Sequence, residues 1–153
     1  MHIAKRVSCL FLVGIMIMSY FVMSASAANT TDSDFSTTVY STYWSGIPAR
    51  AKEDASPIFL YIDTISNGGT HVQVAANGNK TGTGGFTNYT YANGVPVNSV
   101  ICRKLIQYSV HNTINENECT YALLSFRLFH ELATCTVSGT WSPDSTGTYM
   151  DPV

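Results

Sequence analysis

The sequence predicts an all-β protein, a single antiparallel β-sandwich of about seven strands that follows a cleaved signal peptide. Two observations support this fold class. Thr, Val, Ile, Tyr and Phe are dense after residue 38, and these residue types suit a pleated sheet. Turn signals such as Asn-Gly-Gly at 67–69 and Asn-Gly at 93–94 separate short runs. Regularly spaced short strands of this kind are typical of a sandwich.

Residues 1–28 have the three parts of a secretory signal peptide. Lys5 and Arg6 supply positive charge, residues 7–22 are almost wholly apolar, and small residues follow as far as Ala27 and Ala28. A bilayer span needs about 20 apolar residues, so this run is short for a permanent anchor. We predict cleavage after Ala27 or Ala28, a secreted protein and no stable membrane span after cleavage. An uncleaved membrane anchor is the alternative.

The rest of the chain, about 125 residues, suits one domain with one core. Residues 29–38 are polar and aperiodic and predict a flexible N-terminal arm. Residues 39–149 are assigned to the sandwich domain and residues 150–153 to a tail. Strands are expected at residues 39–44, 58–63, 71–76, 86–91, 97–102, 105–111, 119–126 and 134–141.

Alternation of apolar and polar side chains carries most of these assignments. Ile58, Leu60 and Ile62 share one face of their run, and residues 71–76 alternate in the same way, which predicts a hairpin. The glycine-rich residues 77–85 are expected to form a long flexible loop. Residues 119–132 fit helical spacing as well as a strand buried on both faces, so a helix remains the alternative there.

Charge excludes two classes of partner. Loss of Lys5 and Arg6 leaves six basic against ten acidic residues, a formal net charge of −4. Nucleic-acid binding requires clustered Lys and Arg, and anionic membrane surfaces attract the same residues. We therefore expect no nucleic-acid partner and no adsorption to an anionic membrane.

Three cysteines remain after cleavage, Cys102, Cys119 and Cys135. An exported protein meets oxidising conditions, and we predict a disulfide between Cys119 and Cys135, on neighbouring strands. The other pairings stay open, as does the alternative of three buried, reduced thiols. No two of these cysteines have zinc-ligand spacing, so no metal site is expected.

The run from Trp141 to Ser145 has two interpretations. Trp141 ends the last predicted strand, and the Ser-Pro-Asp-Ser sequence after it predicts a type I turn, so the indole closes the core. The alternative is a carbohydrate-stacking Trp141 with Asp144 bound to sugar hydroxyls.

Catalytic motifs are absent from the sequence. No G-x-S-x-G elbow or P-loop occurs, and the acidic residues are scattered. The remaining enzyme hypothesis is a cysteine-dependent hydrolase that uses Cys135 or His130. We expect no enzymatic activity and no cofactor.

Aromatic residues beside Thr and Asn favour a binding surface. Tyr43, Trp44, Tyr89 and Tyr91 are of this kind, and such residues stack on sugar rings while amides bind hydroxyls. The alternative is that they fill the core and cover strands. The expected partner is a cell-wall polysaccharide or an extracellular protein.

Residues 50–56 (RAKEDAS) and 139–145 (GTWSPDS) carry a resemblance to a family. With the signal peptide, they make the chain resemble a group of small exported proteins of Gram-positive (Firmicute) bacteria. The resemblance implies export and a compact β domain, and it implies no catalytic residues. We therefore predict an extracellular or cell-envelope binding module, with a secreted antibacterial or toxin-like protein as the alternative.

Overall fold

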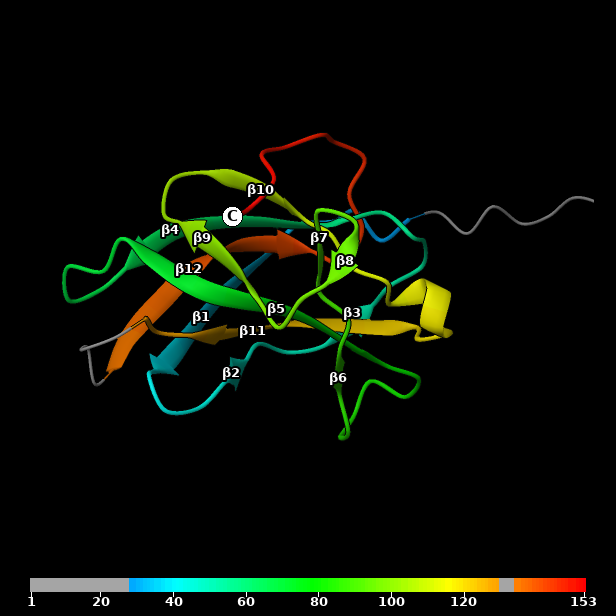
Figure 1. Ribbon diagram of the computed structural model, residues 1–153, viewed down its shortest axis with the longest axis horizontal. Helices are drawn as coiled ribbons and strands as arrows, with labels where there is room; N and C mark the ends of the chain where they lie inside the picture. The colour runs from blue at the N-terminus through cyan, green and yellow to red at the C-terminus, as the bar shows by residue number, and fades with distance from the viewer. Residues whose placement is uncertain (1–27, 130–133) are drawn as a thin grey trace, which may run out of the picture.

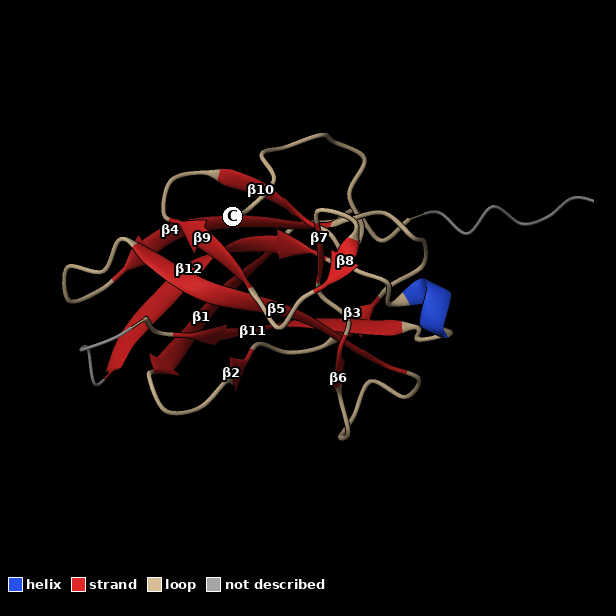
Figure 2. Cartoon of the chain, in the orientation of Figure 1, coloured by secondary structure: helices blue, strands red, loops and turns tan. Residues whose placement is uncertain are grey.

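The computed structural model describes residues 28–129 and 134–153 and forms an antiparallel β-sandwich (Figures 1 and 2). In these residues seven strands have four or more residues, which confirms the predicted class and strand number. They are β1 (Ser33–Tyr40), β4 (Ile58–Ile65), β5 (His71–Asn79), β9 (Val100–Arg103), β10 (Gln107–Val110), β11 (Tyr121–Arg127) and β12 (Thr134–Ser142). The shorter strands are β2 (Ser45–Gly46), β3 (Arg50–Ala51), β6 (Thr87–Asn88), β7 (Tyr91–Ala92) and β8 (Val95–Pro96). Residues 1–27 of the predicted signal peptide, which include Ala27, lie outside the described residues, as does His130.

Two sheets make up the sandwich. Sheet A has the order β1-β12-β4-β10, so the last strand of the chain lies between β1 and β4 (Figure 1). Sheet B has the order β2-β11-β5-β6, with β3 also paired to β11 and β9 to β5. Within the described residues, no helix is long and apolar enough to cross a membrane.

The core lies between the sheets because alternate side chains of each long strand point inward. Val72, Val74 and Ala76 of β5 are buried, as predicted from their spacing. Phe35 of β1 stacks on Phe126 of β11 with ring centroids 5.2 Å apart, which joins the two sheets directly. Burial of each such side chain contributes roughly 1.5–3 kcal/mol.

The predicted flexible arm at residues 29–38 is wrong for its second half, because β1 begins at Ser33. The strand pairs with β12 along its whole length, with Phe35 opposite Gly139 and Val39 opposite Cys135. Only Phe35 and Val39 of this strand are buried, while the other positions are Ser, Thr, Asp34 and Tyr40. An edge strand needs few apolar residues, which explains why its sequence resembles a linker. The domain therefore begins before residue 39.

Two further assignments are settled by the sheets. Residues 121–127 form strand β11 and not a helix, because Ala122, Leu124 and Phe126 alternate into the core. The predicted tail is attached to sheet A, since Ser109 N donates to the carbonyl of Met150 at 3.0 Å.

Candidate functional site

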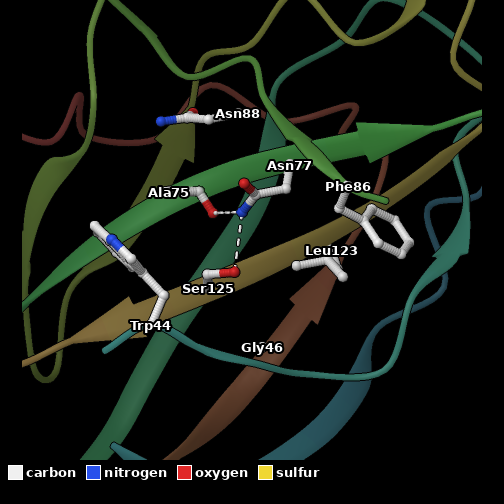
Figure 3. Close-up of a pocket in the computed structure, with 8 residues that line it drawn as sticks. All are labelled: Trp44, Gly46, Ala75, Asn77, Phe86, Asn88, Leu123 and Ser125. Atoms are coloured by element: carbon white, nitrogen blue, oxygen red, sulfur yellow. Dashed lines mark hydrogen bonds between the residues drawn. The ribbon is translucent and has the colours of Figure 1, made fainter. Parts of the chain in front are cut away.

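A groove of about 380 Å³ lies on the outer face of sheet B (Figure 3). Strand side chains alternate between faces, so the residues of β5 and β11 that do not enter the core line this groove. The volume is within the range of small-ligand sites. The lining residues are Trp44, Gly46, Ala75, Asn77, Phe86, Asn88, Leu123 and Ser125.

The backbone ladder of sheet B fixes the floor of the groove. Ser125 of β11 lies opposite Ala75 of β5 on one side and Gly46 of β2 on the other. In the next row, Asn77 of β5 lies between Leu123 and Asn88. Directly opposed residues in antiparallel strands are about 4.5–5.5 Å apart, so the floor presents small and polar side chains at a regular spacing.

Asn77 is held in a defined orientation at the centre of this floor. Its Nδ2 donates to the carbonyl of Ala75 and to Oγ of Ser125, each at 3.0 Å (Figure 3). Its Oδ1 accepts no hydrogen bond from the described residues, and Ser125 keeps its own hydroxyl proton to donate. A hydrogen-bond acceptor and a donor therefore lie side by side on the floor of the groove.

Aromatic side chains stand at the two ends of the groove, Trp44 at one and Phe86 at the other (Figure 3). The Arg127 guanidinium lies 4.9 Å from the centroid of Trp44, a cation–π contact that positions the indole. Arg127 is itself held, because its Nε donates to Oε1 of Gln73 at 2.9 Å. Trp44 nevertheless remains 36% exposed.

The glycine-rich segment before Phe86 is organised by one buried amide and is not the long loop that was predicted. β5 continues to Asn79, and the loop starts after it. The Asn79 Nδ2 donates to the carbonyls of Thr83 and Gly84, while its Oδ1 accepts from the N–H groups of Thr81 and Gly82. Gly82 has a φ of +75°, a conformation that glycine adopts without strain.

Of the six residues predicted for binding, Trp44 alone lines the groove. Tyr43 is adjacent and 52% exposed, but it stacks on Tyr40 at 4.3 Å between centroids. Tyr89 packs against the core, and Tyr91 on β7 donates its hydroxyl to the carbonyl of Gly94. The sequence-based prediction did not include the residues of the groove floor. Ala75 and Asn77 could have been found, because they alternate with the core residues of the same strand.

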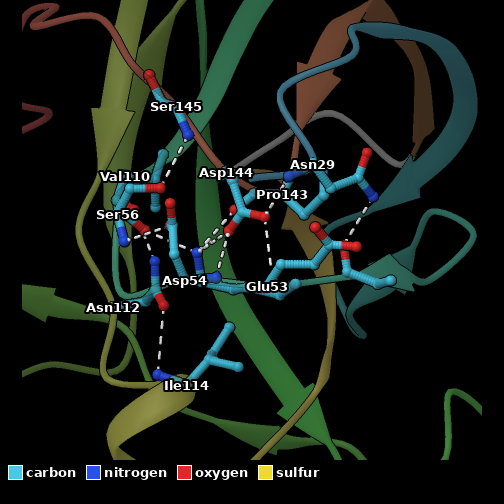
Figure 4. A network of polar contacts seen from close by, with 12 residues as sticks. Asn29, Glu53, Asp54, Ser56, Val110, Asn112, Ile114, Pro143, Asp144 and Ser145 are labelled. Atoms are coloured by element: carbon cyan, nitrogen blue, oxygen red, sulfur yellow. Dashed lines mark hydrogen bonds and ion pairs between the residues drawn. The ribbon is translucent and has the colours of Figure 1, made fainter. Parts of the chain in front are cut away.

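Trp141 and Asp144 do not form a sugar platform, because both are buried. Trp141 closes the core as the first interpretation had it. Asp144 accepts from the ammonium of Lys52 at 3.0 Å and from the backbone N–H groups of Glu53 and Asn29 at 2.9 and 2.8 Å (Figure 4). A buried carboxylate requires such partners.

Residues 50–56 and 139–145 meet at this network. The Arg50 guanidinium lies 5.6 Å from the centroid of Trp141 and donates to the Trp141 carbonyl at 3.3 Å. The N–H of Ser145 donates to Oγ of Ser56 at 2.9 Å. The two segments that carry the resemblance therefore hold the fold together and lie apart from the groove.

The pKa of Asp144 reflects these contacts. Burial alone would raise it, but the N–H of Glu53 and the ammonium of Lys52 outweigh burial and hold the pKa below its usual range. The carboxylate is therefore a charged anchor in the interior of the fold.

The predicted disulfide between Cys119 and Cys135 is wrong, since the three cysteines of the described chain are free and buried. Cys135 belongs to β12 of sheet A, whereas Cys119 precedes β11 and lies beside Gly78 of sheet B. Burial raises the pKa of the Cys102 and Cys135 thiols, which disfavours the thiolate that a cysteine-dependent hydrolase needs.

Comparison with known proteins identifies a family. No match was found among curated proteins or among solved structures. The sequence profile described as "Protein of unknown function (DUF2712)" matches residues 23–145, a span that includes every strand of both sheets and the whole groove. The chain therefore belongs to the DUF2712 family.

Proposed function

We propose that this protein is an exported binding module of the cell envelope that holds a neutral polysaccharide chain in the groove of sheet B. The observation that carries the proposal is the pairing of aromatic side chains at both ends with an uncharged, hydrogen-bonding floor. Export follows from the features of residues 1–28 and from the resemblance to exported Firmicute proteins, and it is part of the proposal.

The chemistry of the lining fits a sugar chain. The C–H faces of pyranose rings are apolar and stack on aromatic rings, as Trp44 and Phe86 would allow. Hydroxyl groups both donate and accept, which suits Oδ1 of Asn77 beside the hydroxyl of Ser125. The groove is open along the outer face of the sheet, so a polymer can lie across it.

Charge favours a neutral glycan over an anionic polymer. None of the eight lining side chains is charged. The chain without its signal peptide has a formal net charge of −4, which opposes attraction to polyanions. A neutral polysaccharide needs no charged partner in the groove and is not repelled by the negative net charge of the protein.

The proposed activity is binding of the polysaccharide without its hydrolysis. Glycoside hydrolysis usually needs a pair of carboxyl groups across the scissile bond, and none of the eight lining residues has a carboxyl group. The side chains of the groove can hold and orient a sugar, but they offer no general acid for its glycosidic oxygen.

The test is co-sedimentation of the exported protein with isolated Gram-positive cell walls and with insoluble neutral polysaccharides such as chitin and cellulose. We expect saturable binding that Trp44→Ala weakens at least about tenfold, or about 1.4 kcal/mol. Tyr43→Ala is the matched control, because this neighbouring aromatic is exposed outside the groove, and its binding should stay within about twofold.

Three outcomes would count against the proposal. Pelleting that Trp44→Ala and Asn77→Ala leave unchanged would remove the groove from the interaction. Binding to no insoluble glycan would contradict the proposed ligand class. Loss of viable counts in cells treated with the protein would instead support the antibacterial alternative.

A further inference from the structure

The backbone nitrogen of Asn29 lies 2.8 Å from Oδ2 of Asp144, a carboxylate with no exposed surface (Figure 4). Asn29 is the residue that directly follows one of the two predicted cleavage positions. The contact spans 115 positions of the chain and joins its N-terminal part to the turn after β12.

The side chain of Asn29 is fixed as well. Its Nδ2 donates to the carbonyl of Ala51 at 2.8 Å, and its Oδ1 accepts from Nη2 of Arg50 at 3.0 Å. The main chain and the side chain of Asn29 are therefore both held by hydrogen bonds to residues far along the chain. A linker that only connects to β1 would not require these contacts.

The sequence before Asn29 permits a cut on either side of Ala28. A cut after Ala27 has Ala25 and Ala27 at the two positions where small residues are needed, and a cut after Ala28 has Ser26 and Ala28. The sequence alone does not choose between these two cleavage sites. The hydrogen bond from the Asn29 nitrogen to Asp144 distinguishes them.

We propose that the chain is processed between Ala28 and Asn29 and that the new α-ammonium of Asn29 forms a buried ion pair with Asp144. An endopeptidase adds water to the amide, the C–N bond breaks, and the carboxylate stays on Ala28. The released amine takes up a proton and becomes an ammonium with three donor hydrogens where the amide had one. The inference rests on the export in the proposed function, but not on the groove.

The surrounding charges accommodate this added positive charge. Lys52 occupies Oδ1 of Asp144, so the ammonium of Asn29 would take Oδ2 and each carboxylate oxygen would face one cation. The fixed charges near the pair are Arg50 and Lys52 against Glu53, Asp54, Glu116 and Asp144. Four negative groups face two positive ones in this set, and the α-ammonium narrows the difference to four against three.

The first experiment is export of the full chain from a Gram-positive host, followed by N-terminal sequencing and intact-mass measurement of the recovered protein. We expect Asn29 at the N-terminus. The pKa of its α-amine, measured by competitive acetylation across pH, should lie at least one unit above the ordinary value of about 7.7–8.0.

A matched variant separates the ion pair from the rest of the fold. Ala28→Leu removes the small residue before Asn29, so cleavage should move to the bond after Ala27 and leave the Asn29 nitrogen as an amide. An amine whose folded-state pKa is raised stabilises the fold below its unfolded-state pKa, and this stability is lost as pH rises through the folded-state pKa. The melting temperature of the wild-type exported protein should therefore fall more between pH 8 and pH 10 than that of the variant.

An exported protein that begins at any other residue would overturn this inference, as would an Asn29 amine with an ordinary pKa. The two proposals can be contradicted separately. A protein that begins at Asn29 but binds no polysaccharide contradicts only the proposed function. A chain that is never exported contradicts the export on which both rest.

Discussion

The ammonium of Lys52 lies 3.0 Å from Oδ1 of Asp144, and neither side chain is exposed to solvent. Lys52 also donates to the carbonyls of Ser56 and Pro143, at 2.7 and 2.8 Å. Lys52→Met would remove the ammonium from Oδ1 of Asp144 and leave this buried carboxylate oxygen without its cation. We expect the free energy of unfolding to fall by about 3–5 kcal/mol, measured by urea denaturation.

The control for this variant is Lys80→Met. Lys80 pairs with Glu118 at 2.8 Å, but the two side chains are 62% and 82% exposed. A pair in solvent contributes at most about 1 kcal/mol, so this variant should be nearly neutral. Losses of equal size at Lys52 and Lys80 would contradict the role given to burial.

Acid should weaken the fold through Asp144. Its folded-state pKa is depressed, so its contribution is present above its unfolded-state pKa of about 3.9 and is lost as pH falls through the folded-state value. We expect the difference in unfolding free energy between wild type and Asp144→Asn to shrink below about pH 4. A difference that stays constant from pH 6 to pH 2 would refute this assignment.

The two tryptophans should respond differently to collisional quenching. Trp44 is 36% exposed and Trp141 is 2% exposed. Acrylamide reaches only exposed indoles, so Trp44→Phe should abolish most of the quenching in the native protein, whereas Trp141→Phe should leave it in place. The reverse pattern would place Trp141 at the surface and would contradict the buried network around it.

Gly139→Ala should destabilise the fold through backbone collision. A Cβ at this position would meet the carbonyl oxygen of Tyr61 on β4, at the point where the register of β12 shifts. Overpacking of this kind costs roughly 1–3 kcal/mol or more. Gly46→Ala is the control, because its Cβ would make only an ordinary contact of 3.5 Å with Leu123. Thermal unfolding of both variants measures the contrast.

Thiol reagents should find no reactive cysteine in the folded protein. The three described cysteines are buried, and burial raises the pKa of Cys102 and Cys135. We expect negligible reaction with a disulfide reagent in buffer and reaction of three thiols per chain in denaturant, for the protein without its signal peptide. Rapid labelling under native conditions would reopen the cysteine-hydrolase hypothesis.

Sequence patterns predicted the strands whose alternation is strong. The expected strands at 58–63, 71–76 and 134–141 correspond to β4, β5 and β12 with small changes at their ends. The predicted hairpin of the first two was wrong, because β4 belongs to sheet A and β5 to sheet B. The strand expected at residues 39–44 was wrong, since β1 ends at Tyr40. The bounds of β1 are set by its pairing with β12, and a pairing partner 94 or more positions away leaves no local signal in the sequence.

The candidate site was predictable only in part. Trp44 was chosen because it is aromatic, but its neighbours in the groove come from four strands, β2, β5, β6 and β11, and from the loop that contains Phe86. The alternation of residues 71–76 already placed Gln73 and Ala75 opposite the core face. Extension of that pattern by one step would have included Asn77, had residues 77–85 not been assigned to a loop.

Sequence proximity was a poor guide to two contacts: it predicted a disulfide that does not form, and it gave no sign of the buried ion pair. Cys119 and Cys135 are close in sequence, yet Cys135 lies on a strand of sheet A whereas Cys119 lies in the connection beside sheet B. Lys52 and Asp144 are 92 positions apart, and both residue types are ordinarily at the surface. Only the fold brings a lysine and an aspartate of this kind together in the interior.

The position of β12 in the middle of sheet A has a consequence for the order of assembly. Its neighbours β1 and β4 contact each other through β12, so the first strand of the domain has no partner in sheet A until the last has been synthesised. Contacts between distant segments are slow to form because a long loop must close first. The ribosome must therefore release almost the entire chain before sheet A can be completed, whereas every strand of sheet B has been synthesised by residue 127.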